Sequence, residues 1–452
     1  MRERVTGVPS GGASLIAVVF VVVAVAAAGL TSWRDDLAVP IAAAVVVAVM
    51  AVLDWRIPVV LAALVLPTSV SLTTPVGFVA VSDALLLAGL LGALVRGDLL
   101  HALRIRAVRL VAGALGVYLG LALALGLASG AEGVVVEVAV RTMFWIPPLL
   151  AGAALAVRDG VQGVRWMLSA YLAGSVAVAV SWLLSPFAGT VLFTHKNGAG
   201  QTLALAVLII ASSLRPRSRP LAVAIAIICG AGLIATGSRG ALLSLALGLV
   251  VLAVLSVLRQ ATPGRIVTSL GVIIVSVAVL TVLSETILAR VAAFSTDYTV
   301  QIRLTFWADA IGQTVGREWI GNGVGAYAQQ SSSLQRVLTL DPHNVYVLTY
   351  FEGGILLLIA FAAAMVTILV VLLRLRRTGG AAVLAATMQI VLLAHTLIDV
   401  YWSRGSLTLP MIVTGCAVAL GALERPRSTD RGTTAVPPRS QLLTAEEMGS
   451  VG

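Results

Sequence analysis

The sequence predicts an all-α protein, a polytopic bundle of about 12–14 transmembrane helices with one large extracytoplasmic loop. Of its 452 residues, 59% are hydrophobic and only 11% are charged, which is too apolar for a water-soluble chain of this length. The apolar residues fall in runs of about 17–25, the length that a helix needs to cross roughly 30 Å of hydrocarbon with its backbone hydrogen bonds satisfied. The arginines lie in the short turns between runs and form no basic patch, so the net charge of +10 indicates membrane orientation and no nucleic-acid partner.

Fourteen apolar segments are expected to span the bilayer. No small-residue cleavage site follows the first, so it is expected to be an anchored span and not a removed signal peptide. The third is interrupted by Pro67 and Pro75. In chain order the spans are 14–31, 38–53, 57–73, 79–95, 107–128, 134–157, 165–185, 198–214, 220–236, 239–258, 265–284, 345–373, 380–397 and 405–422.

Orientation follows from the arginines, which favour the cytoplasmic side of a membrane. With residues 1–13 in the cytoplasm, nearly every arginine-bearing turn is also cytoplasmic, and so is the tail 423–452. That tail is rich in Pro, Ser, Thr and Arg and is expected to be disordered. The excess of arginine over lysine, with many Ala, Val and Gly residues, indicates a GC-rich bacterial genome. Cys229 and Cys416 fall in different spans and are expected to be small buried hydrophobes.

The segment 285–344 is the only long hydrophilic stretch between the spans, which otherwise fill 14–284 and 345–422. Within it an amphipathic helix is predicted, lying on the membrane surface or capping the bundle. A glycine cluster then ends the helix as a turn. Such a cluster can also bind phosphate, but this one follows no strand and faces away from ATP. The helix carries Ile302, Phe306, Ala310 and Val315 on one face, and the cluster is Gly321–Gly325.

Charged residues within or next to spans are costly and usually functional, and here Asp83, Glu137, Arg141, Glu352 and Asp399 all fall at the outer ends of spans. Glu137 and Arg141 are four residues apart, which predicts either a self-neutralising ion pair or an arginine able to bind a ligand phosphate.

A second pair at the outer ends of the spans has the same spacing. His395 and Asp399 are also four apart, near Arg404, and a hydrogen bond at the end of the helix is the expected account of this pair.

Three outer turns are denser in polar residues. Taken singly, Arg239 could reach lipid headgroups and His343 could join Asn344 in a helix cap. Together, cations that bind phosphate and a histidine that accepts a proton favour a site for a large anionic substrate. With four histidines and no HExxH spacing, no metal and no cofactor are expected. The residues of the three turns are His195, Lys196 and Asn197; Arg239; and His343 with Asn344.

At these residues the chain resembles the O-antigen ligase and polysaccharide polymerase family of bacterial membrane glycosyltransferases, over roughly residues 185 to 422. The resemblance implies a GT-C-like helical bundle, and it is specific in the combination and order of its motifs. The family's usual twelve or so spans are fewer than the fourteen expected here. The motifs are the turns at His195–Asn197 and Ser238–Ala241, Arg303 with Trp307, Gly321–Gly325, and His343-Asn344 followed by Glu352-Gly353-Gly354.

Members of this family transfer a glycan from a polyprenyl diphosphate carrier to an acceptor hydroxyl at the outer face of the membrane, without a nucleotide sugar or a metal. A bacterial cytoplasmic membrane is the expected location, as the resemblance implies. Carried onto this chain, the resemblance implies that His343 orients or deprotonates the acceptor hydroxyl, and it makes Arg239 a catalytic residue at the diphosphate. The further diphosphate-binding residues that it implies are Lys196, Arg141, Arg303 and Asn197.

Three alternatives remain open in the sequence. A polymerase is slightly favoured over a ligase, because an actinobacterium-like composition leaves lipid A unexpected as the acceptor. A transporter or flippase would place ionisable groups near the midplane, whereas the inner halves of these spans are almost free of charge. A structural subunit of a glycan assembly complex would leave His343 and Arg239 without a role. Expected partners are the lipid-linked glycan, an acceptor glycan or lipid, and the bilayer.

Overall fold

We describe the chain from a computed structural model. The description covers residues 38–424 apart from 69, 75–76, 187, 189, 193, 213, 215, 275–297, 328–341 and 398–406. The predicted first span, the terminal segments, Asp399 and Arg404 lie outside the described residues.

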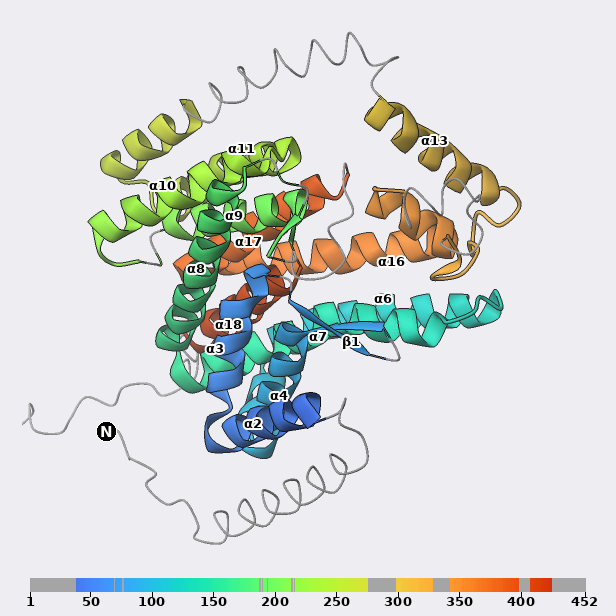
Figure 1. Cartoon of the computed structure of the whole chain (residues 1–452), viewed down its shortest axis with the longest axis horizontal. Coiled ribbons are helices and arrows are strands. Elements are labelled where there is room, and N and C mark those ends of the chain that lie inside the picture. Colours follow the sequence, from blue (N-terminus) through green and yellow to red (C-terminus); the bar gives the residue numbers. More distant parts are fainter. Residues whose placement is uncertain are drawn as a thin grey trace, which may run out of the picture.

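The described chain is almost entirely helical, which confirms the predicted fold class (Figure 1). The helices and the single 3-10 turn are α2 (Ala38–Asp54), α3 (Arg56–Val65), η2 (Leu66–Thr68), α4 (Val81–Val95), α5 (Asp98–Arg104), α6 (Arg106–Ala128), α7 (Val134–Asp159), α8 (Val161–Leu184), α9 (Lys196–Ala211), α10 (Arg219–Thr236), α11 (Arg239–Arg259), α13 (Tyr298–Gln313), α16 (Val345–Leu375), α17 (Gly380–His395) and α18 (Thr408–Leu423). A further apolar helix covers Pro263–Ile274.

Six of the described helices are long and apolar enough to cross a membrane: α6, α7, α8, α10, α11 and α16. A seventh span results if α4 and α5, which meet at 84°, are counted as one broken span. Other predicted spans are apolar helices of 10–17 residues, among them α9, α17 and α18. The chain is therefore a multi-pass membrane protein, and within its described part fewer helices reach full spanning length than the apolar runs predicted.

The third predicted span, 57–73, is wrong. The helix ends at Val65, and the 3-10 turn at Leu66–Thr68 contains Pro67, whose ring removes a backbone donor and stops an α-helix. The chain then forms the antiparallel hairpin β1 (Ser71–Thr74) and β2 (Gly77–Ala80). A second short hairpin, β3 (Thr190–Val191) with β4 (Thr194–His195), precedes α9.

The bundle core is packed through glycines. α7 and α18 approach so closely that a Cβ at Gly415 would lie 1.9 Å from the Leu149 carbonyl oxygen, and one at Gly152 would lie 2.1 Å from the Ile412 oxygen. The Cys416 thiol donates to the Gly152 carbonyl at 3.1 Å. Small residues of this kind let membrane helices pack backbone to backbone. Both cysteines are buried and free, as predicted.

We name two ends of the bundle by their residues: the His343 end, where α16 begins, and the Arg259 end, where α11 finishes. Figure 1 shows α16 beside α6, and α9, α11 and α17 packed together. The two ends carry different chemistry.

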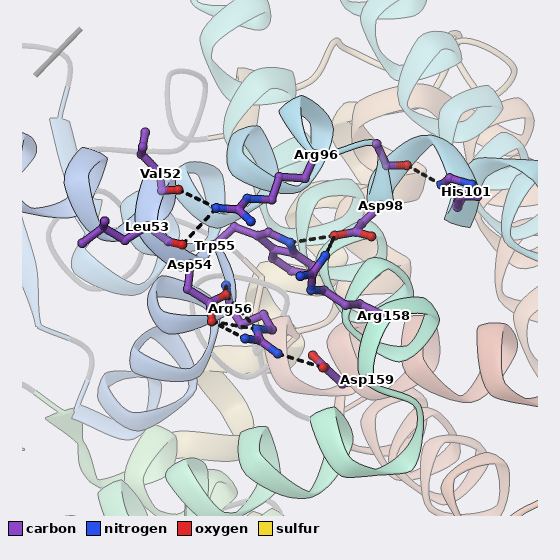
Figure 2. Close-up of polar contacts among 11 residues, drawn as sticks. Val52, Leu53, Asp54, Trp55, Arg56, Arg96, Asp98, His101, Arg158 and Asp159 are labelled. Atoms are coloured by element: carbon purple, nitrogen blue, oxygen red, sulfur yellow. Dashed lines mark hydrogen bonds and ion pairs between the residues drawn. The ribbon is translucent and has the colours of Figure 1, made fainter. Parts of the chain in front are cut away.

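An ionic cluster ties the turns at the Arg259 end (Figure 2). Asp98 accepts from the Trp55 indole N–H and from Arg158, both at 2.9 Å. Arg56 pairs with Asp54 and, at 2.9 Å, with Asp159. These bonds join the α2–α3, α4–α5 and α7–α8 turns, so these charges serve the fold.

Candidate functional site

Helix α16 is broken two turns after it begins. Gly353 (φ −138°, ψ 16°) and Gly354 (φ 60°, ψ −158°) leave the helical conformation. Such a break exposes backbone donors and acceptors that lipid cannot satisfy. Irregular backbone at membrane depth therefore needs protein partners.

The segment after α13 supplies those partners. Backbone N–H groups of Asn322 and Gly323 donate to the carbonyls of Phe351 and Glu352, both at 2.8 Å. In return, the N–H groups of Ile355 and Leu356 donate to the carbonyls at Glu318 and Trp319. A Cβ at Gly321 would lie 2.4 Å from the Gly353 nitrogen, and one at Gly354 would lie 2.4 Å from the Glu318 oxygen. We call Glu318–Gly325 with the Gly353–Gly354 break the glycine lock.

The hydrogen bonds of the glycine lock exclude the alternative that Gly321–Gly325 is a phosphate-binding loop. In addition to the two donors above, the Gly325 N–H is taken by Glu352 Oε1 at 3.1 Å. Amides that already donate to the protein cannot cradle a phosphate. At the start of the lock, the Gly316 N–H donates to Glu318 at 2.8 Å and holds the pKa of that exposed carboxyl below its usual range.

Arg141 lies in an ion-pair network beside the lock. The predicted Glu137–Arg141 pair is present at 3.1 Å. The guanidinium also makes two bonds to Glu352, at 2.6 and 2.7 Å. Glu352 is only 1% exposed, so this bidentate pair joins α7 to α16 inside the bundle. Three of the arginine's five N–H groups are thereby occupied.

The predicted cap at Asn344 is also present. Its side-chain oxygen accepts from the N–H groups of Tyr346 and Val347, at 2.9 and 3.1 Å, and begins α16. His343 just before it has a φ of 52°, a left-handed conformation that is costly for a residue other than glycine. The Trp307 indole N–H donates to the Pro342 carbonyl at 2.8 Å. His343 therefore lies between two residues whose positions are fixed by hydrogen bonds, Pro342 and Asn344.

The bond from Trp307 to Pro342 places α13 beside the His343 turn. Arg303 precedes Trp307 by four residues on one helical face, and is half-buried. The predicted amphipathic helix is confirmed, with Phe306 and Ala310 buried. The prediction was wrong for Val315, which lies beyond the end of α13 and is 73% exposed, because the chain turns there.

The far end of α17 links α16 to α11. Asn344 donates to the Leu397 carbonyl and the Tyr346 hydroxyl to the Leu393 carbonyl, both at 3.0 Å. Between Leu393 and Leu397 in the chain, His395 is buried and its Nδ1 lies 2.5 Å from the hydroxyl of Ser244. Ser244 belongs to the second turn of α11, whose first residue is Arg239. The Arg239 and His343 turns are thus tied to one helix end.

Lys196 and Asn197 open α9 beside the same α11 turn. A Cβ at Gly200 would lie 2.7 Å from Ser238 Cβ and 2.8 Å from Ala241 Cβ. Arg239 and Lys196 are both exposed, and neither has an ion pair among the described residues. The structure therefore gathers Lys196, Asn197, Arg239, Arg303 and His343 at the His343 end and places Arg141 in a separate ion-pair network.

Sequence reasoning missed two features here. Glu352 was noted as a charge near a span end, but its pairing with Arg141 across 211 positions left no local pattern. Ser244 resembles any small residue of an apolar helix. The interlock of Gly321–Gly325 with Gly353-Gly354 did leave a signal, namely two glycine clusters flanking the cap at Asn344.

Residues 224–362 match the family model described as O-antigen ligase. The match includes Arg239, α13, the glycine lock and the His343 turn, and is shorter than the resemblance seen in the motifs, since it leaves out the turn at Lys196. A search of the curated proteins found no match. Residues 224–362 of this multi-pass membrane protein are thus similar to the O-antigen ligase family, which supports the resemblance carried by the motifs.

Proposed function

We propose that the protein transfers a glycan from a polyprenyl diphosphate carrier to an acceptor hydroxyl, and that the His343 end performs this reaction at the outer face of the cytoplasmic membrane. The observation that carries the proposal is the convergence of three turns far apart in sequence, those at Lys196, Arg239 and His343, on one end of the bundle. The family match supports a ligase or polymerase type of activity.

Arg239 and Lys196 are proposed to bind the diphosphate. Both are exposed cations at the first residue of a helix, where the backbone amides and the helix dipole also favour an anion. Two cations here stabilise the charge that develops on the departing diphosphate. Arg303 and Asn197 are proposed to hold the same group from α13 and from the second residue of α9.

His343 is proposed to act on the acceptor. In the reaction, the acceptor oxygen forms a bond to the anomeric carbon of the donor sugar while the bond from that carbon to the diphosphate oxygen breaks. The polyprenyl diphosphate leaves with the electron pair, and the acceptor proton passes to the imidazole. The left-handed backbone of His343 supports this role, since strain of this kind persists where the surroundings hold a functional residue in place.

Arg141 receives a different proposed role from the one implied by the resemblance. Its guanidinium faces two carboxylates, which cancel the positive charge that a diphosphate would need. We propose that Arg141 positions the site by joining α7 to the break in α16.

We favour a polymerase over a ligase on the sequence composition alone, because both activities use the same donor. The acceptor separates them. A polymerase extends one carrier-linked glycan with another, whereas a ligase moves the finished glycan to a different acceptor.

The proposal is tested with purified protein in proteoliposomes that contain lipid-linked glycan extracted from a host strain lacking the gene. The wild-type protein is expected to lengthen the lipid-linked glycan and release polyprenyl diphosphate in equal amounts, without nucleotide sugar. The His343→Ala variant, matched for melting temperature, is expected to lose at least 100-fold in rate, in line with loss of a general base. Equal rates in the two proteins contradict the assignment.

A further inference from the structure

We propose that the Arg259 end carries a second, separate lipid site: a cavity between α9, α11 and the helix Pro263–Ile274 that binds the phosphate headgroup and upper acyl chain of an anionic glycerophospholipid. This site has no part in the proposed transfer reaction.

The cavity has the two kinds of surface that a phospholipid needs. It measures about 350 Å³, within the usual range of ligand pockets. Its apolar lining includes Leu249, Leu252 and Val272. Its polar lining includes Ser256, Arg259 and Arg265. Among the described residues that line the cavity there is no carboxylate.

Neither arginine of the cavity has a carboxylate partner in the described part of the chain. Arg259 Nε is buried and has no hydrogen-bond partner in the described part of the chain, and a buried donor left in this way is costly. Arg265 gives one N–H to the side-chain oxygen of Gln260, a neutral partner that does not offset its charge. A phosphate between the two guanidinium groups would satisfy both.

The surrounding surface identifies the source of that phosphate. A soluble anion would use the arginines and leave the apolar lining at Leu249 and Leu252 unused, whereas a phospholipid uses both. Basic pockets between membrane helices at the arginine-rich side bind anionic headgroups in this manner. The cavity is too small for a whole lipid, so the remaining acyl chain extends into the bilayer.

The phosphate-binding part of the cavity is far from the His343 end. Arg259 is the last residue of α11 and Arg239 the first, and a helix of this length spans about 30 Å. That distance is one hydrocarbon thickness. The two sites therefore meet opposite leaflets.

Native mass spectrometry of the purified protein tests this site with three probes: dioleoylphosphatidylglycerol, dioleoylglycerol, which lacks the phosphate, and inorganic phosphate. The wild-type protein is expected to retain one phosphatidylglycerol and neither of the other probes. Retention should fall at least tenfold in the Arg259→Gln/Arg265→Gln variant. It should be unchanged in Arg374→Gln/Arg377→Gln, a matched pair of exposed arginines at the end of α16 that lie outside the cavity.

A cavity-filling variant, Val272→Trp, removes no charge and is expected to lose the lipid as well. This variant carries the test if the double arginine variant does not fold. The proposal is overturned if phosphatidylglycerol is retained by either cavity variant as well as by the wild type. Equal retention of dioleoylglycerol, or binding of inorganic phosphate without the lipid, also overturns it.

Discussion

At the scale of single residues, His343 combines a reactive side chain with a backbone conformation that the chain must enforce. Its φ of 52° costs on the order of 1–3 kcal/mol. The bond from Trp307 to the Pro342 carbonyl on one side and the Asn344 cap on the other hold this conformation in place. Stability and activity are therefore expected to respond in opposite directions to one substitution.

Replacing His343 by glycine tests this opposition. Because glycine adopts positive φ freely, the variant is expected to be as stable as the wild type or about 1 kcal/mol more stable, while transfer is lost with the imidazole. Thermal unfolding in detergent and the proteoliposome transfer rate provide the two measurements. A marked loss of stability in His343→Gly would show that the imidazole supports the fold, and would remove the main argument for its catalytic role.

The polar residues of the site were largely predictable one by one, because charges and histidines are rare in this sequence and stand out against it. Their partners were not. Glu352 pairs with Arg141 across 211 residues, and no sequence pattern within one apolar run predicts a contact between two distant helices.

Glu352 and Glu137 give a matched test of that contact. Glu352→Gln leaves a buried guanidinium with reduced compensation and is expected to cost about 3 kcal/mol. Glu137, whose side chain is 42% exposed, is expected to cost at most about 1 kcal/mol when changed to Gln. The melting temperatures of the two variants measure whether the Arg141–Glu352 pair stabilises the protein more than the Arg141–Glu137 pair does. Equal small losses would show that the Arg141–Glu352 pair does not support the α16 break.

At the scale of elements, the break in α16 and the turn after α13 depend on each other. Neither hydrogen-bonds fully by itself, and each supplies the donors and acceptors that the other lacks. The glycines at Gly321 and Gly354 allow a backbone approach that no side chain permits. The large loop is thereby fixed to the bundle directly after α13, the helix that carries Arg303.

Gly354→Ala is expected to destabilise the protein by about 3 kcal/mol. The alanine would have to keep the positive φ of Gly354, and its Cβ would lie against the Glu318 carbonyl oxygen. Gly120→Ala in α6 is the control, since nothing lies within 4 Å of a Cβ there, and it is expected to change stability by less than about 0.5 kcal/mol. Denaturation midpoints of both variants are the measurement. If Gly354→Ala proves as stable as the control, the glycine lock is not rigid.

Hydropathy predicted the helices well and their ends less well. The segment after α3 looked like a continuation of a span, and Pro67 followed by the β1–β2 hairpin replaced it. Periodicity likewise carried the amphipathic helix on to Val315, where the chain had already turned. Apolar composition does not distinguish the end of a helix from the start of a short hairpin, so these ends depend on tertiary packing.

At the scale of the whole molecule, the two ends differ in how their charges are used. At the Arg259 end, Arg56 and Arg158 are paired with carboxylates of neighbouring turns (Figure 2). At the His343 end, Arg239 and Lys196 stay exposed without an ion pair in the described part of the chain. Arg56 and Arg158 are thus neutralised by the fold, whereas Arg239 and Lys196 keep their charge for a ligand.

The orientation of these ends is tested by cysteine labelling, because Cys229 and Cys416 are buried and give little background. On intact spheroplasts, a membrane-impermeant maleimide is expected to label Lys196→Cys and to leave Arg374→Cys unlabelled until the membrane is opened. The arginine bias of the loops is the reason for this expectation. The reverse pattern would place the His343 end in the cytoplasm and contradict the proposed function.

The central claim is that the His343 end binds a lipid diphosphate through its cations and uses the histidine only for reaction, and equilibrium binding of polyprenyl diphosphate to the purified protein tests it most directly. Arg239→Gln should weaken binding at least tenfold, whereas His343→Gly and Arg109→Gln, an exposed arginine near the start of α6, should bind as the wild type does. If Arg239→Gln binds normally, or if His343→Gly is weakened as much as Arg239→Gln, this division of roles is contradicted.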